Sequence, residues 1–196
     1  MADILLFGPH GAGKTQLVYS LRNEEYTNPM QTGEEDYKAK KSGPWWKFGL
    51  SKFSLHEIGG KDRYYKDKDF LTSAFQTNER LVFVFNGNDF IKELINYQSG
   101  GLITSLLRCH IMPVLSKCGK QKSIQFVATY EDEYLGNKPD MASEIISCIE
   151  YANNEYREEA HSTRYTFKEL MHGNLFCVDA RDPQKVKEIF KQINKS

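Results

Sequence analysis

The residues Gly8-Pro9-His10-Gly11-Ala12-Gly13-Lys14-Thr15 match the phosphate-binding loop pattern G-x-x-x-x-G-K-[S/T]. An apolar run, 4–7, precedes this loop and a helix-like stretch, 14–22, follows it, which is the context that the pattern requires. Glycines let backbone N–H groups converge on phosphate oxygens at the start of a helix. We therefore expect a nucleoside triphosphate here, with Lys14 at the terminal phosphates and the Thr15 hydroxyl on Mg²⁺. An anion-binding turn without nucleotide is the alternative.

The length and charge of the chain limit the remaining choices. A chain of 196 residues fits a single domain, 1–196. Lys plus Arg and Asp plus Glu both number 26, so the net charge is zero and no general basic field argues for nucleic acid. The four cysteines form no C-x-x-C pair, so we expect reduced thiols in the cytoplasm and no metal other than Mg²⁺.

Targeting and anchoring signals are not found in the sequence. The first apolar strand begins almost at Met1, and no apolar run is long enough to span a bilayer. Position 2 is not glycine and the chain ends without a prenylation motif. We expect a cytoplasmic protein with no direct membrane anchor.

Apolar runs and helical patterns alternate along the chain, which predicts an α/β fold. Buried parallel strands are predicted at 4–7, 81–85, 124–128 and 175–178, and an antiparallel hairpin at 45–48 and 53–58. Helices are predicted at 14–22, 67–76, 90–97, 102–118, 140–156 and 183–193, the last with Asp182 as its cap before Pro183. The expected fold has three layers and a mostly parallel six-stranded sheet with one antiparallel edge strand.

Two motifs follow the phosphate loop in the order in which a known protein family carries them. His56-Glu57-Ile58-Gly59-Gly60 ends the predicted hairpin, and 81–89, Leu-Val-Phe-Val-Phe-Asn-Gly-Asn-Asp, follows it. With the phosphate loop, these motifs resemble the P-loop small GTPases of the Ras superfamily, and the Arf-like branch most closely. The resemblance covers most of the chain, although its later motifs are degenerate. It implies a GTP/GDP-binding switch that acts on an effector or regulatory protein through two nucleotide-sensitive segments, 23–44 and 61–76.

The resemblance assigns the phosphate side of the site. It implies that Gly60 senses the γ-phosphate through its backbone and that Glu57, in place of the family's aspartate, holds Mg²⁺ through water. Thr32 matches the threonine that binds Mg²⁺ from the first switch, with Thr27 as the alternative. The loop residues expected to bind nucleotide are Gly8, His10, Gly11, Ala12, Gly13, Lys14, Thr15 and Gln16.

Catalysis by this set of residues should be slow. Lys61 stands where the family has the glutamine that orients the attacking water, and a lysine cannot accept a hydrogen bond. His10 is a candidate to replace that function, although a solvent-facing loop side chain is the simpler interpretation. Lys14, Lys61 and His10 are the candidate catalytic residues.

The resemblance also assigns the base side of the site. Asp132 takes the place of the aspartate that accepts guanine N1–H and the exocyclic amine. Thr129 replaces the family's asparagine, and Tyr130 replaces the lysine whose stem covers the base; an aromatic ring can cover it by stacking. Ala180 and Arg181 match the loop whose backbone N–H contacts guanine O6.

Two other functions remain open at this point. The substitutions at Glu57, Lys61, Thr129 and Tyr130 favour a pseudo-GTPase, an interaction module that binds nucleotide without cycling. A P-loop nucleotide kinase is a weaker alternative, because no arginine-rich lid is found between the later helices. Guanine rather than adenine is the expected base, since adenine offers no paired donors to a carboxylate.

Overall fold

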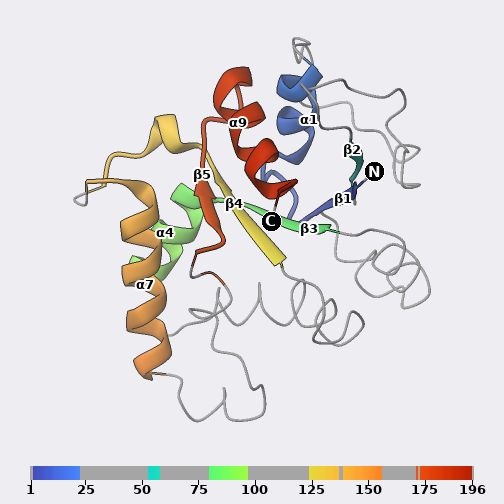
Figure 1. The fold of residues 1–196 in the computed structure, drawn as a ribbon. Helices are drawn as coiled ribbons and strands as arrows, with labels where there is room; N and C mark the ends of the chain where they lie inside the picture. The colour runs from blue at the N-terminus through green and yellow to red at the C-terminus, as the bar shows by residue number, and fades with distance from the viewer. Residues whose placement is uncertain are drawn as a thin grey trace.

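Parallel strands form the centre of the fold in a computed structural model of the chain (Figure 1). They are β1 (Ala2–Phe7), β2 (Phe53–Glu57), β3 (Arg80–Asn86), β4 (Ile124–Thr129) and β5 (Leu175–Cys177). Among the described residues they make a five-stranded sheet in the order β2-β1-β3-β4-β5, and every neighbouring pair is parallel. The α/β class and the parallel sheet are thus confirmed.

The structure describes residues 2–22, 53–57, 80–96, 124–136, 139–155, 171 and 173–195. The predicted strand 45–48, the helices 67–76 and 102–118 and both predicted switch segments lie outside these ranges. The predicted antiparallel edge strand, and with it the count of six strands, therefore stays a prediction.

The described helices begin and end close to the predicted positions. They are α1 (Lys14–Arg22), α4 (Gly87–Asn96), α7 (Met141–Glu155) and α9 (Pro183–Ile193), with a short 3₁₀ helix η4 (Glu131–Glu133). The predicted cap of α9 is confirmed, because the Asp182 carboxylate accepts hydrogen bonds from the backbone N–H groups of Gln184 and Lys185. Helix α4 begins three residues earlier than predicted. Asn86 caps it by accepting from the Asp89 N–H and donating to the Asp89 carboxylate.

Side chains on the two faces of the sheet form separate packing layers. Helices α1 and α9 lie together on one face (Figure 1), where Leu17 and Phe190 are buried against Ile4, Val82 and Val127.

On the other face, aromatic rings make up much of the layer. The rings of Phe7, Phe83, Phe85 and Phe126 contact one another in tilted, stacked and edge-to-face pairs, and Phe90 of α4 contacts Phe85 at a ring-centroid distance of 5.2 Å. Because successive strand residues point to opposite faces, burial on both sides explains why β3 reads as a continuous apolar run and why β4 is apolar except at Gln125 and Thr129. In the part of the chain that the structure describes, no helix combines the length and apolar character needed to cross a membrane.

The start of α7 depends on one carboxylate. Asp140 accepts hydrogen bonds from the Ser143 backbone N–H at 2.7 Å and from the Ser143 hydroxyl at 3.0 Å. These bonds, the backbone one foremost, hold the pKa of Asp140 below its ordinary value of 3.8. We expect Asp140→Ala to lower the free energy of unfolding by about 1 kcal/mol at neutral pH, measured by urea denaturation.

The sign of the pH dependence follows from that lowered pKa. The ionised Asp140 stabilises the fold fully above the unfolded-state pKa, and the contribution is lost as the pH falls through the lower folded-state pKa. The stability difference between wild type and Asp140→Ala should therefore shrink towards about pH 2. Asp140→Asn keeps a capping oxygen without the charge and should show most of the stability without this pH dependence. A difference between wild type and Asp140→Ala that is the same at both pH values would contradict this assignment.

Candidate nucleotide-binding site

The loop between β1 and α1 lies at the carboxyl end of the sheet, where the segments after β3, β4 and β5 also begin. Gly11 and Gly13 have φ values of +76° and +79°, which is left-handed backbone. The first ladder bond of α1 runs from the Leu17 N–H to the Gly13 carbonyl at 3.0 Å. The N–H groups at the start of a helix have no intrahelical acceptor and carry partial positive charge. This end of α1 therefore has the backbone of an anion cradle.

Lys14 places its charge inside this loop. Its ammonium group donates to the Gly8 carbonyl at 3.0 Å and to the Pro9 carbonyl at 2.7 Å, and the residue is only 5% exposed. A buried ammonium held by two carbonyls is compatible with phosphate binding, because its charge is fixed beside the helix N-terminus. His10, the other described candidate for catalysis, is exposed in the same loop.

The other loop residues differ in burial. Ala12 is buried, while Thr15 and Gln16 in the first turn of α1 are partly buried. The Gln16 amide donates to the Ser20 hydroxyl at 3.4 Å. The Thr15 hydroxyl is an oxygen ligand of the kind that Mg²⁺ prefers, so its chemistry fits the predicted metal.

Thr129, at the end of β4, joins the phosphate loop to the sheet. The residue is fully buried, and its hydroxyl lies 2.9 Å from the Ala12 carbonyl oxygen and 3.1 Å from that of Phe85. A Cβ atom added to Gly13 would lie 3.2 Å from the Thr129 methyl carbon, so this approach favours glycine. The sequence assigned Thr129 to the base, whereas the structure shows its hydroxyl on protein carbonyls.

We expect Thr129→Val to lower the free energy of unfolding by about 1–2 kcal/mol, because the shape is kept while buried carbonyls lose their donor. Amide hydrogen exchange at Leu17, whose N–H bonds the Gly13 carbonyl, should become faster. Thr129→Ser keeps the hydroxyl and loses only a methyl group. Exchange at Leu17 that is equally fast in both variants would show that the hydroxyl does not hold the loop.

Tyr130 extends from β4 back to the phosphate loop. Its hydroxyl donates to the Gly11 carbonyl at 3.3 Å, and its backbone is left-handed, with a φ of 62°. The Asn88 side chain donates to the Tyr130 carbonyl at 2.8 Å and so supports this conformation. Burial, followed by the charges of Glu133 and Asp89, raises the pKa of Tyr130, so the phenol stays protonated and able to donate.

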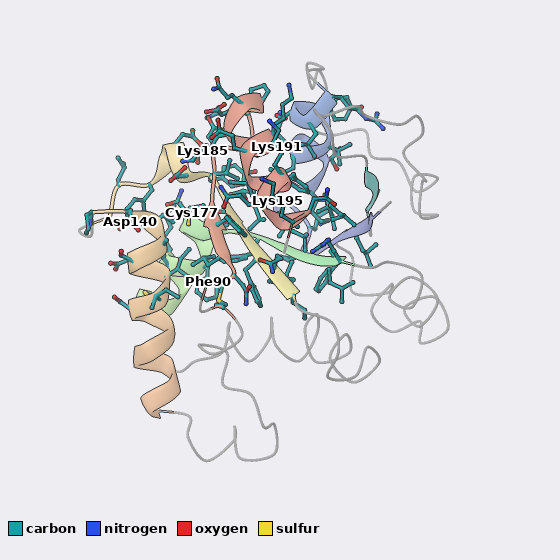
Figure 2. The ribbon with its side chains drawn as sticks, in the orientation of Figure 1. Phe90, Asp140, Cys177, Lys185, Lys191 and Lys195 are labelled. Atoms are coloured by element: carbon teal, nitrogen blue, oxygen red, sulfur yellow. The ribbon has the colours of Figure 1, made fainter. Side chains whose placement is uncertain are left out.

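Two ion pairs join η4 to the segment after β5. Arg181 Nη2 contacts Asp132 Oδ2, and Lys185 Nζ contacts Glu131 Oε2. Figure 2 shows Lys185 near the start of α9, beside the segment that follows β4. The structure thus brings together Asp132 and Arg181, which the sequence assigned separately to the base.

Arg181 is held by a second carboxylate as well. Its Nε lies 3.2 Å from Asp179 Oδ1, and its backbone N–H donates to the same oxygen at 2.8 Å. The hydrogen bond to Asp179 and then the charges of Asp179 and Asp132 raise the pKa of Arg181 above its ordinary value. The guanidinium, cationic like that of any arginine, is placed between two carboxylates.

Sequence reasoning missed two polar residues that position this site. Ser20 of α1 donates its hydroxyl to the Ala180 carbonyl and thereby ties the α1 helix to the loop after β5. Asn88 supports Tyr130, as described above. A sequence signal for Asn88 was present, since a polar residue just after the predicted parallel strand 81–85 lies at the sheet edge where ligands bind. Ser20, inside a helix, gives no comparable local signal.

Most of the residues predicted for Mg²⁺ and the γ-phosphate lie outside the described ranges. Gly60, Lys61, Thr32 and its alternative Thr27 lie outside the described residues. Glu57 is the last residue of β2 and pairs with Leu6 in register, which places its backbone at the carboxyl end of the sheet. Within the described ranges, no group of three or more His, Cys, Asp or Glu residues is arranged to hold a metal ion.

The chain resembles known proteins in its structure rather than in its overall sequence. No protein-family model and no curated protein sequence matches the chain. A GTP-binding protein from Sulfolobus solfataricus in complex with GDP superposes with a TM-score of 0.59 and 14% identity, over 99% of this chain and 52% of the other. The Arl6 (BBS3) small GTPase from Trypanosoma brucei with bound GppNp superposes with a TM-score of 0.55 and 14% identity, over 99% of this chain and 95% of the other.

A bacterial selenocysteine-specific elongation factor, EF-Sec, is also similar, with a TM-score of 0.55 and 15% identity. The match includes 99% of this chain but 28% of the elongation factor. Identities this low establish the fold alone, and the similarity to Arl6 is consistent with the Arf-like resemblance of the motifs. The chain therefore has the fold of the P-loop GTPases.

Proposed function

We propose that this protein is a GTP/GDP-binding molecular switch that hydrolyses GTP slowly in the presence of Mg²⁺. The observation that supports it best is the buried Lys14 ammonium inside a glycine-containing loop at the N-terminus of α1. The backbone N–H groups of this loop, with Lys14, supply positive charge for a polyphosphate. The P-loop GTPase fold supports the same conclusion.

Mg²⁺ would neutralise charge on the phosphates, held by the Thr15 hydroxyl and, as the sequence predicts, by Thr32 and Glu57. Hydrolysis would be slow because Lys61 cannot accept a hydrogen bond from the attacking water. The predicted segments 23–44 and 61–76 would change order with the γ-phosphate and present that change to a protein partner.

The base side supports guanine. Asp132 follows β4 at the sheet edge where the phosphate loop begins, and a carboxylate can accept from both guanine N1–H and the exocyclic amine. Tyr130, whose hydroxyl reaches the Gly11 carbonyl, would cover one face of the base. The loop that contains Ala180, tied to α1 through Ser20, would supply a backbone N–H to the base.

A pseudo-GTPase is the second candidate, and one observation favours it. The Thr129 hydroxyl, at the position of the family's asparagine, is bonded to protein carbonyls and the residue is fully buried, so it attaches the phosphate loop to the sheet. A nucleotide bound in this way, with Lys61 in place of the glutamine that orients water, would be kept as a structural element. This function shares the phosphate cradle with the first and differs from it in turnover.

Two measurements on the purified protein test the proposal. Mass spectrometry of nucleotide released by denaturation, with calorimetry of added GDP and ADP in Mg²⁺, should identify guanine as the bound base. Phosphate release from GTP should continue over many turnovers at a low rate and exceed that of Lys14→Ala. Adenine selectivity, or no binding of either nucleotide, would contradict the proposal. Guanine binding without sustained phosphate release would establish the second candidate instead.

A further inference from the structure

We propose that Arg181 sets the strength of guanine selection by competing with the base for the carboxylate of Asp132. This inference rests on the proposed function, because it concerns the base side of the same site. Arg181 becomes a specificity-determining residue that limits the preference for guanine. The base does not need to contact Arg181 for this effect to operate.

Asp179 holds the guanidinium of Arg181 in place beside Asp132. Asp179 Oδ1 binds both the Arg181 backbone N–H, at 2.8 Å, and Nε, at 3.2 Å. These two bonds hold the backbone and the Nε of Arg181, and its Nη2 projects to Asp132 Oδ2. The arginine therefore reaches Asp132 from a prearranged position, and forming the pair costs less side-chain entropy than it would for a free arginine.

Arg181 and the proposed guanine base offer Asp132 similar hydrogen-bond donors. A guanidinium presents N–H donors in one plane, which is the geometry that a carboxylate accepts best. Guanine presents the same pattern with N1–H and its exocyclic amine. Arg181 Nη2 already occupies Oδ2 of Asp132, and guanine needs both carboxylate oxygens, so a base that binds Asp132 must displace Arg181 or share Oδ2 with it. Adenine lacks paired donors on this edge and does not enter this competition.

Exposure of the pair sets the size of the effect. The side chains of Arg181 and Asp132 are 63% and 28% exposed, and an ion pair this accessible to water is weak. Removing the arginine should therefore improve guanine affinity by a modest factor of about two to five. A second ion pair between the same two segments, Glu131 with Lys185, offers a matched control that leaves Asp132 untouched.

Calorimetry of GDP, IDP and ADP in Mg²⁺ on four proteins tests the inference: wild type, Arg181→Ala, Lys185→Ala and the double variant Asp132→Ala/Arg181→Ala. Inosine keeps N1–H but lacks the exocyclic amine. Arg181→Ala should bind GDP about two- to five-fold more tightly, gain less for IDP and leave ADP unchanged. Lys185→Ala should leave the GDP-to-ADP ratio as in wild type. The double variant should show no gain in GDP affinity over wild type, because the carboxylate of Asp132 is absent.

The outcomes separate this inference from the proposed function. If wild type selects GDP over ADP and Arg181→Ala leaves that ratio unchanged or lowers it, the inference is wrong and the proposed function stands. An equal gain for GDP and ADP would also overturn it, because the effect would then lie outside the base. If neither wild type nor Arg181→Ala binds any nucleotide, both proposals fail. Circular dichroism and urea denaturation of each variant show whether the fold is kept.

Discussion

Lys14→Ala is expected to weaken the binding of GDP and GTP by at least about 100-fold, close to complete loss in a calorimetric titration. The ammonium group is buried in the phosphate loop and lies within hydrogen-bond distance of the Gly8 and Pro9 carbonyls. Alanine removes a buried charge that, in the proposed function, would face the polyphosphate, and charge interactions are strong at a buried position. The variant also leaves two carbonyls of the loop without this donor.

Two control variants separate the lost charge from a loosened loop. Lys191→Ala makes the same substitution at an exposed position of α9 and should bind nucleotide as wild type does (Figure 2). Thr129→Val loosens the attachment of the loop without removing a charge, and it should weaken binding far less than Lys14→Ala. Retention of wild-type GTP affinity in a folded Lys14→Ala protein would refute the phosphate cradle, and with it the proposed function.

The sequence predicted the described elements well because their signals are local. Apolar runs gave the positions of β1, β3 and β4, and the bounds of α1 and α9 coincide with the prediction. For α9 the reason is direct, since Asp182 and Pro183 define a helix start through their own hydrogen bonds and fixed φ. The partner of a strand has no such local signal. Hydrophobic alternation in 53–57 indicated a strand but not its parallel pairing with β1.

The candidate site was predictable where it is contiguous in sequence. The phosphate loop is one segment, so its spacing alone identified Lys14 and Thr15. Contacts on the base side join residues far apart: 49 positions separate Asp132 from Arg181, and 160 separate Ser20 from Ala180. These contacts depend on how β4, β5 and α1 meet at the sheet edge.

Gly8→Ala is expected to destabilise the fold by about 3–5 kcal/mol, a large share of the stability of a typical domain. A Cβ atom at Gly8 would lie 2.0 Å from the Val84 carbonyl oxygen, and the φ of +141° is one that side-chain-bearing residues rarely adopt. The colliding atom is backbone of the central strand β3, so no side chain can move aside. Either β1 must separate from β3 or the loop must leave the sheet edge.

Gly11→Ala provides the matched control for the effect of a collision. Gly11 also has a positive φ, +76°, but no atom lies within 4 Å of the added Cβ. The Gly11→Ala substitution should lower the free energy of unfolding by the conformational strain alone, about 1–2 kcal/mol. Urea denaturation of both variants measures the difference in the free energy of unfolding, and Gly11→Ala should be the more stable variant by about 1–4 kcal/mol. Equal destabilisation would mean that the loop relaxes away from Val84 at no cost. The close approach of the loop to β3 would then not determine the shape of the phosphate cradle.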